Sequence, residues 1–395
     1  MRRFYLTVIL ALTGALLLIQ PTSAPGAMRF AAPDGNVTAC SQSAPCSLET
    51  ALSQSVDGDT VYARWGVYTS ATVIGFDHNI TLIGRWDGGT GPAVGRLLQA
   101  DATILDGENQ RRVVYIIGNV APTLDGITIQ GGRASEGAGV AVYAGASATL
   151  TDVIVRNNVA TAGWGGGVQV DNSTLLIQHS QIINNSTSNG GGGVAAAWGS
   201  QVTLHNNLIA NNSAGENGAG VRLRDVTATL TNNTIVGGQG VGAEGIYASE
   251  QEAVTTLTLT NNIITGQTYG VRFGGSLAGV ATISYNDVWG NTTANYSGLA
   301  DPTGADGNIS ADPLFVNGPS RWAGGWDFAG YYLSQTAAGQ PVTSPAMDAG
   351  SGSASQMNLA ARTTRSDSQV DSGVVDMGFH YPLFYPVFLP ICIKQ

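Results

Sequence analysis

The 395-residue chain has little of what marks several common functional classes. It has one lysine, Lys394, and a formal net charge of −10, so a surface that binds nucleic-acid phosphates is not expected. It has three cysteines and four histidines, without a CxxC or Cys/His cluster of zinc spacing, so no metal site is predicted. GxSxG and EF-hand spacings are also missing. These absences argue against a nucleic-acid-binding protein and against a zinc-binding or EF-hand protein.

Long apolar runs are absent after the N-terminus. Residues 1–27 combine two arginines, an apolar stretch from Phe4 to Ile19 and small residues, which is typical of a secretory signal peptide. A retained transmembrane anchor is the alternative. Export agrees with Cys40 and Cys46, which lie six residues apart in a Gly/Pro/Ser-rich segment and are predicted to form a disulfide.

Glycine is abundant, with 54 residues, and it punctuates a repeat. One unit is typified by LHNNLIANN, residues 204–212, whose sixth position recurs every 24 to 29 residues. Its copies place there Ile129, Val155, Ile182, Ile209, Ile235, Ile264 and Val288. A second unit, GxGV or a variant, ends at Val140, Val168, Val194, Val221, Ile246 and Val271. Two or more short strands per period, without helical spacing, predict an all-β parallel β-helix, a solenoid with coils about 4.8 Å apart.

Asparagine recurs at equivalent places of consecutive coils, at Asn207, Asn233, Asn262 and Asn286. This predicts an internal ladder of amide groups. The N-terminal end needs a cap, and residues 47–56 predict a short helix with Ser47 as its N-cap. We therefore expect an N-terminal cap over residues 28–59 and β-helix repeats over 60–300.

The GxGV strands alternate with period two, and one face of them has two columns expected to point to solvent. The first column is Ala141, Gln169, Ala195, Arg222, Tyr247 and Arg272. The second column is Tyr143, Asp171, Ala197, Arg224, Ser249 and Gly274. Asp171 and Arg224 lie two coils apart, hence about 10 Å, so no compact acid and base pair emerges. Arg222, Tyr247 and Arg272 are expected to stack, with a substrate clamp as the alternative.

At this point the chain resembles the secreted bacterial right-handed parallel β-helix proteins of the pectin-lyase-like superfamily. The segments that carry the resemblance are ACSQSAPCSLETALSQSVDGDTVYARWGVYT, ITLIGRWDGG, ATILDG and the NN and GxGV coils. YNDVWGN, GNISADPLFVN, YYLS, SPAMDAGS and VDMGFHY resemble a choice-of-anchor Q region, which we assign to residues 301–383 as a C-terminal cap region. The apolar tail, residues 384–395, either attaches the protein to a surface or caps the final coil. The right-handed sense follows from the resemblance and from the general handedness of parallel crossovers.

The resemblance also implies a type of site. Pectate lyases hold Ca²⁺ with acidic residues and remove a proton with an arginine or lysine, on an exposed strand face. The candidate catalytic residues here are Arg222, Arg224, Arg272 and Asp171. The candidate ligand-binding residues are Tyr143, Trp164, Trp198 and Tyr247, with corner packing as the alternative for the two tryptophans. Loops not placed by the pattern would have to bring in Asp152, Asp225 or Glu244.

Because the two columns contain one carboxylate, we predict a non-catalytic scaffold for carbohydrate or cell-surface contacts. A polysaccharide lyase or hydrolase on the same face is the alternative. No cofactor is expected, although Ca²⁺ is possible. Asp301, Asp306 and Asp312 are interpreted as residues of solvated turns rather than as Ca²⁺ ligands. We expect a secreted or surface-bound monomer that meets a membrane only through residues 1–27 or the tail.

Overall fold

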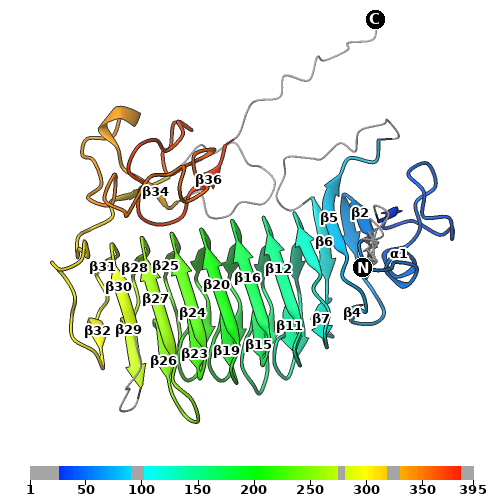
Figure 1. Ribbon diagram of the computed structural model, residues 1–395, viewed down its shortest axis with the longest axis horizontal. Coiled ribbons are helices and arrows are strands. Elements are labelled where there is room, and N and C mark those ends of the chain that lie inside the picture. The colour runs from blue at the N-terminus through cyan, green and yellow to red at the C-terminus, as the bar shows by residue number, and fades with distance from the viewer. Residues whose placement is uncertain (1–25, 90–101, 275–280, 318–329, 384–395) are drawn as a thin grey trace, which may run out of the picture.

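The computed structural model describes residues 26–89, 102–274, 281–317 and 330–383, and its main body is a parallel β-solenoid (Figure 1). The predicted signal segment, Cys392 and the C-terminal tail lie outside the described residues, apart from Gly26 and Ala27. Three long sheets run along the solenoid, and each strand pairs in parallel with the equivalent strands of adjacent coils. Within the described ranges, no helix is long and apolar enough to cross a membrane.

Each coil contributes one strand to each long sheet. Sheet A contains β1 (Met28–Ala31), β2 (Thr60–Arg64), β5 (Thr81–Trp86), β8 (Thr123–Asp125), β12 (Ser147–Thr151), β16 (Thr174–Gln178), β20 (Gln201–His205), β24 (Thr227–Thr231), β27 (Thr256–Thr260) and β30 (Ala281–Ser284). Sheet B contains β3 (Gly66–Tyr68), β6 (Thr103–Asp106), β9 (Thr128–Gln130), β13 (Ile154–Arg156), β17 (Gln181–Ile183), β21 (Leu208–Ala210), β25 (Thr234–Val236), β28 (Ile263–Thr265) and β31 (Asp287–Trp289).

Sheet C includes the strands of the GxGV units. It contains β4 (Ile74–Phe76), β7 (Val114–Ile117), β11 (Val140–Tyr143), β15 (Val168–Asp171), β19 (Val194–Ala197), β23 (Val221–Arg224), β26 (Glu244–Ser249), β29 (Tyr269–Gly274) and β32 (Ala294–Ser297). A short fourth sheet contains β10 (Arg133–Ala134), β14 (Val159–Ala160), β18 (Ser186–Thr187) and β22 (Ser213–Ala214).

The nonapeptide LHNNLIANN forms β20, a corner and β21. Leu204 and Ile209 are buried inside the solenoid, whereas Leu208 is buried against the C-terminal region on the outer side of sheet B. The Asn207 amide donates to Asn233 Oδ1 at 3.0 Å, and the same bond continues through the next coils. The predicted amide ladder is therefore present, and it satisfies buried polar groups that apolar residues would leave unpaired.

A second internal ladder lies at the other corner of sheet B. Asn158 donates to Asn185 Oδ1 at 2.9 Å, and Asn185 donates to Asn212 Oδ1 at 3.1 Å. Each of these amides also donates to a backbone carbonyl of the preceding coil, for example Asn185 to Val155 at 2.9 Å. The two ladders thus join adjacent coils at both corners of sheet B.

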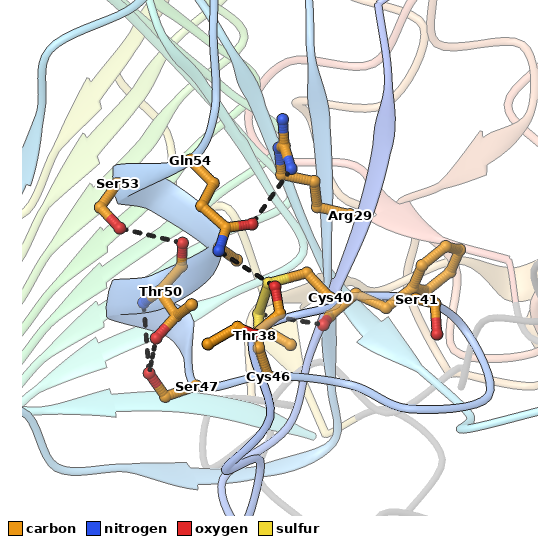
Figure 2. The surroundings of a disulfide bond; sticks show 12 residues. Arg29, Thr38, Cys40, Ser41, Cys46, Ser47, Thr50, Ser53 and Gln54 are labelled. Carbon is orange, nitrogen blue, oxygen red and sulfur yellow. Dashed lines mark hydrogen bonds between the residues drawn. A yellow bond between two sulfur atoms is a disulfide. The ribbon is translucent and has the colours of Figure 1, made fainter.

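The N-terminal end carries the expected helix and disulfide (Figure 2). Helix α1 (Leu48–Ser53) begins after Ser47, whose Oγ accepts from the backbone N–H of Thr50 at 3.2 Å. Cys40 and Cys46 are bonded and buried beside this helix. The disulfide closes a short loop that lacks a sheet of its own, which fits the small amount of apolar surface there.

Residues 330–383 pack along the outer side of sheet B (Figure 1). It contains the antiparallel pair of β35 (Arg362–Thr363) with β36 (Tyr381–Pro382) and the 3-10 helix η1 (Thr336–Ala338). Its strand β34 (Tyr332–Leu333) pairs in antiparallel fashion with β33 (Phe315–Val316), which precedes the region. Phe379 and Tyr381 are buried against Leu208 and its neighbours. Sheet B is therefore buried on both faces where this region covers it.

The corner residues between sheets A and B have left-handed φ values of 49° to 69° and are Gly126, Asp152, His179, Asn206, Asn232, Asn261 and Tyr285. Four of them, Asp152, Asn206, Asn232 and Asn261, also bond to this region. Asn206 exchanges two hydrogen bonds with the His380 backbone, and Asn232 donates to the Asp376 carbonyl at 3.1 Å.

Candidate functional site

The outer face of sheet C is less exposed to solvent than the alternation of apolar and polar residues in its strands predicts. We expected the first column to face solvent, and for its first four members this is wrong: Ala141, Gln169 and Ala195 are 0% exposed and Arg222 is 7% exposed. The glycine turns before each strand fold back over them. A Cβ at Gly191, for instance, would lie 2.4 Å from the Cβ of Ala195, so only glycine permits this close approach.

The second column is open in part. Ala197 and Ser249 are buried, so the prediction is wrong for them as well, while Tyr143, Asp171 and Arg224 are half-buried. The accessible part of this face therefore lies at the ends of β11, β15 and β23, and at Tyr247 and Arg272 of the first column, which are half-buried on β26 and β29. This narrows the candidate site to a few side chains.

Two arginines and two tryptophans meet on this face, and we call Trp164, Trp198, Arg222 and Arg224 the arginine–tryptophan patch. The Cζ atoms of Arg222 and Arg224 lie 3.8 Å and 4.0 Å from the Trp164 ring centroid. Arg224 Cζ also lies 4.4 Å from the ring of Trp198, which is 41% exposed. Cation–π contacts of this kind hold both guanidinium groups at the same indole.

Hydrogen bonds fix the patch from adjacent turns. Trp164 Nε1 donates to Asn189 Oδ1 at 3.0 Å, and Arg222 Nε donates to Asn217 Oδ1 at 3.2 Å. Arg224 Nη1 donates to Gln251 Oε1 at 2.7 Å. These partners are neutral amides, so within the described residues neither arginine forms an ion pair. Their charge is therefore not cancelled by a direct contact.

Burial also affects the ionisation of the patch. Burial and the neighbouring Arg224 lower the pKa of Arg222 to about 10, so Arg222 stays charged at neutral pH. Its Nη1 and the Nε of Arg224 are buried without a hydrogen-bond partner. Each such group costs about 1–3 kcal/mol. The patch thus carries an unrelieved electrostatic cost, as binding sites often do.

Asp171 lies beside the patch on β15. Burial raises its pKa to about 6, although Gln169 Nε2 donates to its Oδ1 at 2.8 Å and the two arginines favour its charged form. Glu136 adds to the rise. Asp171 therefore changes charge close to neutral pH, which suits a group that takes up or releases a proton.

The remaining sequence candidates lie further along the face. The Tyr143 ring is 5.8 Å from that of Tyr115, and Arg112 Cζ lies over both rings. At the other end, Arg272 Cζ is 5.9 Å from the Tyr247 ring and its Nη1 is 2.8 Å from buried Glu244. The predicted Arg222–Tyr247–Arg272 stack forms only in its second half, because Arg222 packs on Trp164.

The acidic residues outside the two columns, which were considered as additional site residues, are bound to structural partners. Asp152 pairs with Arg362 at 3.0 Å, and Asp225 accepts from the backbone N–H groups of residues 251–253. Asp301 and Asp312 each accept from the backbone two residues ahead, as in ordinary turns. Sequence reasoning missed the amides of residues 189, 217 and 251, because their loops reach the patch only after folding.

Among the described residues, one group of side chains could hold a metal ion. One ligand atom each of Asp371, Asp376 and His380 lies within 4.8 Å of the others, and all three residues are buried. It lies against the corner residues of sheet B, away from the arginine–tryptophan patch. Asp301, Asp306 and Asp312 are not part of such a group.

Comparison with known proteins supports the fold. Residues 112–288 match the family described as "Right handed beta helix region". Among solved structures, the pectate lyase Pel9A is similar with a TM-score of 0.54 and 15% identity, over 90% of this chain and 97% of that one. No curated protein matches the sequence. The chain therefore has a right-handed parallel β-helix fold.

Proposed function

We propose that this is an exported or cell-surface protein that binds an anionic polysaccharide at the arginine–tryptophan patch, as a monomer and without catalysis. The observation that supports this is the pair of guanidinium groups on Trp164, which have no ion pair within the described residues although the chain has a net charge of −10. Positive charge kept in this way on an acidic protein favours an anionic ligand.

The geometry indicates how a sugar would bind. Trp198 is 41% exposed and offers a flat apolar face to a pyranose ring, and Arg224 beside it is within reach of a carboxylate. Arg222 is 7% exposed, so it contributes positive charge beneath Trp164 and does not contact the sugar directly. Regular coils leave room for further sugar units along the face, toward Tyr143 and toward Tyr247.

Binding is tested by calorimetry of the mature chain, residues 28–395, with polygalacturonate and with neutral dextran. A charged hydrogen bond contributes about 1.5–3 kcal/mol, so Arg224→Gln should weaken polygalacturonate binding roughly 10- to 100-fold. Arg133→Gln is the matched control, because Arg133 is exposed on β10 outside the patch. Equal losses in the two variants, or equal affinity for dextran, would reject the patch as the site.

A polysaccharide lyase is the second candidate function. Asp171 favours it, because its pKa of about 6 lies near neutral pH and it is placed beside two arginines. The similarity to a pectate lyase is compatible with it but concerns the fold alone. In this case Asp171 would exchange the proton, and the arginines would stabilise negative charge on the uronate.

Unsaturated products absorbing at 235 nm decide between the two functions. Catalysis by Asp171 requires that turnover rise with pH through about 6 and that Asp171→Asn abolish turnover while binding is retained. Binding without product at any pH, with or without Ca²⁺, supports the non-catalytic function. Product formation that survives Asp171→Asn would remove this residue from the mechanism.

A further inference from the structure

A buried polar group lies in the C-terminal region, close to where that region meets the solenoid. Asp371, Asp376 and His380 are 6%, 4% and 0% exposed, and His380 Nε2 lies 2.7 Å from Asp371 Oδ2. The backbone of the same segment is bonded to the solenoid corner at Asn206 and Asn232. The group therefore lies where the last described segment meets the β-helix.

The neutral form of His380 cannot donate a hydrogen bond at both of its ring nitrogens, although both contact an oxygen. His380 Nδ1 lies 3.0 Å from the Gly378 carbonyl, so both ring nitrogens face oxygen acceptors. A neutral imidazole carries only one N–H. Two carboxylates and one imidazole in a buried site leave negative charge that needs a cation or further protons.

Gln335 supplies an independent sign of a missing ligand. Its side chain is 1% exposed and extends to the group, with Nε2 3.3 Å from Thr364 Oγ1 and 3.5 Å from Asp376 Oδ2. Its Oε1 is buried without any hydrogen-bond partner. An unpaired amide oxygen, on a side chain whose Nε2 already contacts Asp376, is a neutral ligand atom that a cation would satisfy once the amide turns.

We propose that Asp371, Asp376 and His380 bind one Zn²⁺ ion, with the Gln335 amide oxygen turned toward it. Two carboxylate oxygens and one imidazole nitrogen suit Zn²⁺, whereas Ca²⁺ and Mg²⁺ prefer all-oxygen sets. The ion replaces the extra proton on the His380–Asp371 contact and neutralises the carboxylates. Bound there, it cross-links the C-terminal region internally and so stabilises the segment whose backbone is hydrogen-bonded to Asn206 and Asn232 at the corner of sheet B.

The test uses the mature chain with Cys392→Ser, so that this cysteine cannot bind zinc. After dialysis against a chelator, ZnCl₂ is added during calorimetry and thermal unfolding. We expect one Zn²⁺ per chain and a higher melting temperature that the chelator reverses. Loss of an outer-shell partner already costs 10- to 100-fold in affinity, so Asp371→Asn and His380→Gln should lose about 100-fold or more.

Two controls make each outcome decisive. Asp77→Asn removes an exposed carboxylate near α1 and should bind Zn²⁺ like the parent. Asp376→Asn keeps a hydrogen-bonding side chain but removes its charge. If protons rather than a metal ion neutralise the buried group, this variant should melt at or above the melting temperature of the parent, and Zn²⁺ should change the melting temperature of neither protein. That result, or failure of the parent to bind one Zn²⁺, overturns the proposal even if other variants do not fold.

Discussion

Replacing Asn233 by alanine should open the solenoid locally. Asn233 is fully buried; its Oδ1 accepts from the backbone N–H and the amide of Asn207, at 2.9 Å and 3.0 Å. Its Nδ2 donates to the Leu204 carbonyl at 2.8 Å and to Asn262 Oδ1 at 2.9 Å. Alanine removes all four bonds and leaves the Asn207 N–H without a partner. At about 1–3 kcal/mol for that N–H and about 1 kcal/mol for each other bond, the loss is roughly 4–6 kcal/mol.

Native-state amide hydrogen exchange is the suitable assay, because a solenoid unfolds in parts and a single unfolding free energy is poorly defined for it. The opening free energy of β20, β24 and β27 should fall by the stated amount, and that of β1 should fall less. Asn36→Ala, at an exposed position, should change neither by more than about 0.5 kcal/mol. A loss below about 1 kcal/mol in β24 would refute the idea that the ladder stabilises the coils.

Three further predictions concern acid stability, the disulfide and the docked C-terminal region. Burial, with the charge of Arg362, lowers the pKa of His179 to about 3, so its neutral form is favoured in the folded state. Stability from this group is present above about pH 6.5 and lost as the pH falls toward 3; His179→Gln should flatten the fall in melting temperature across that window, and an unchanged slope would contradict this. Replacing Cys40 and Cys46 by serine should destabilise β1 by roughly 2 kcal/mol in hydrogen exchange, since the loop is short, and an unchanged β1 would contradict this. Phe379→Ala should cost about 3–5 kcal/mol and speed proteolysis within residues 330–383, while resistance equal to wild type would count against its docking role.

The coils and their ladders could be predicted because each coil encodes them locally. Leu204 and Ile209 recur at the coil period, and Asn207 recurs with them, so spacing alone identifies core and corner. The N-cap at Ser47 and the disulfide also depend on residues close together in sequence. Local signals of this kind survive folding unchanged because neighbouring coils repeat them.

The burial of the first column on the outer face of sheet C could not be predicted from the alternation of apolar and polar residues along the strands. Ala195 has the same spacing as an exposed residue, yet the turn containing Gly191 folds over it. Glycine marks a turn with positive φ but does not say across which face the chain passes afterwards. Placing Arg222 below Trp164 depends on the same turns, so the arginine–tryptophan patch became visible only in three dimensions.

The corner between sheets A and B explains why the repeat uses a pair of asparagines. The second of each pair, such as Asn207, points inward and builds the ladder; the first, such as Asn206, adopts the left-handed conformation that turns the chain. Glycine would serve the turn equally well. It would provide no amide, however, and at Asn206 and Asn232 the outward amide is what bonds the Asp376 to His380 segment. The asparagine pairs thus hold adjacent coils together on one side and bind the C-terminal region on the other, and the buried carboxylate and histidine group lies at the point where these two roles meet.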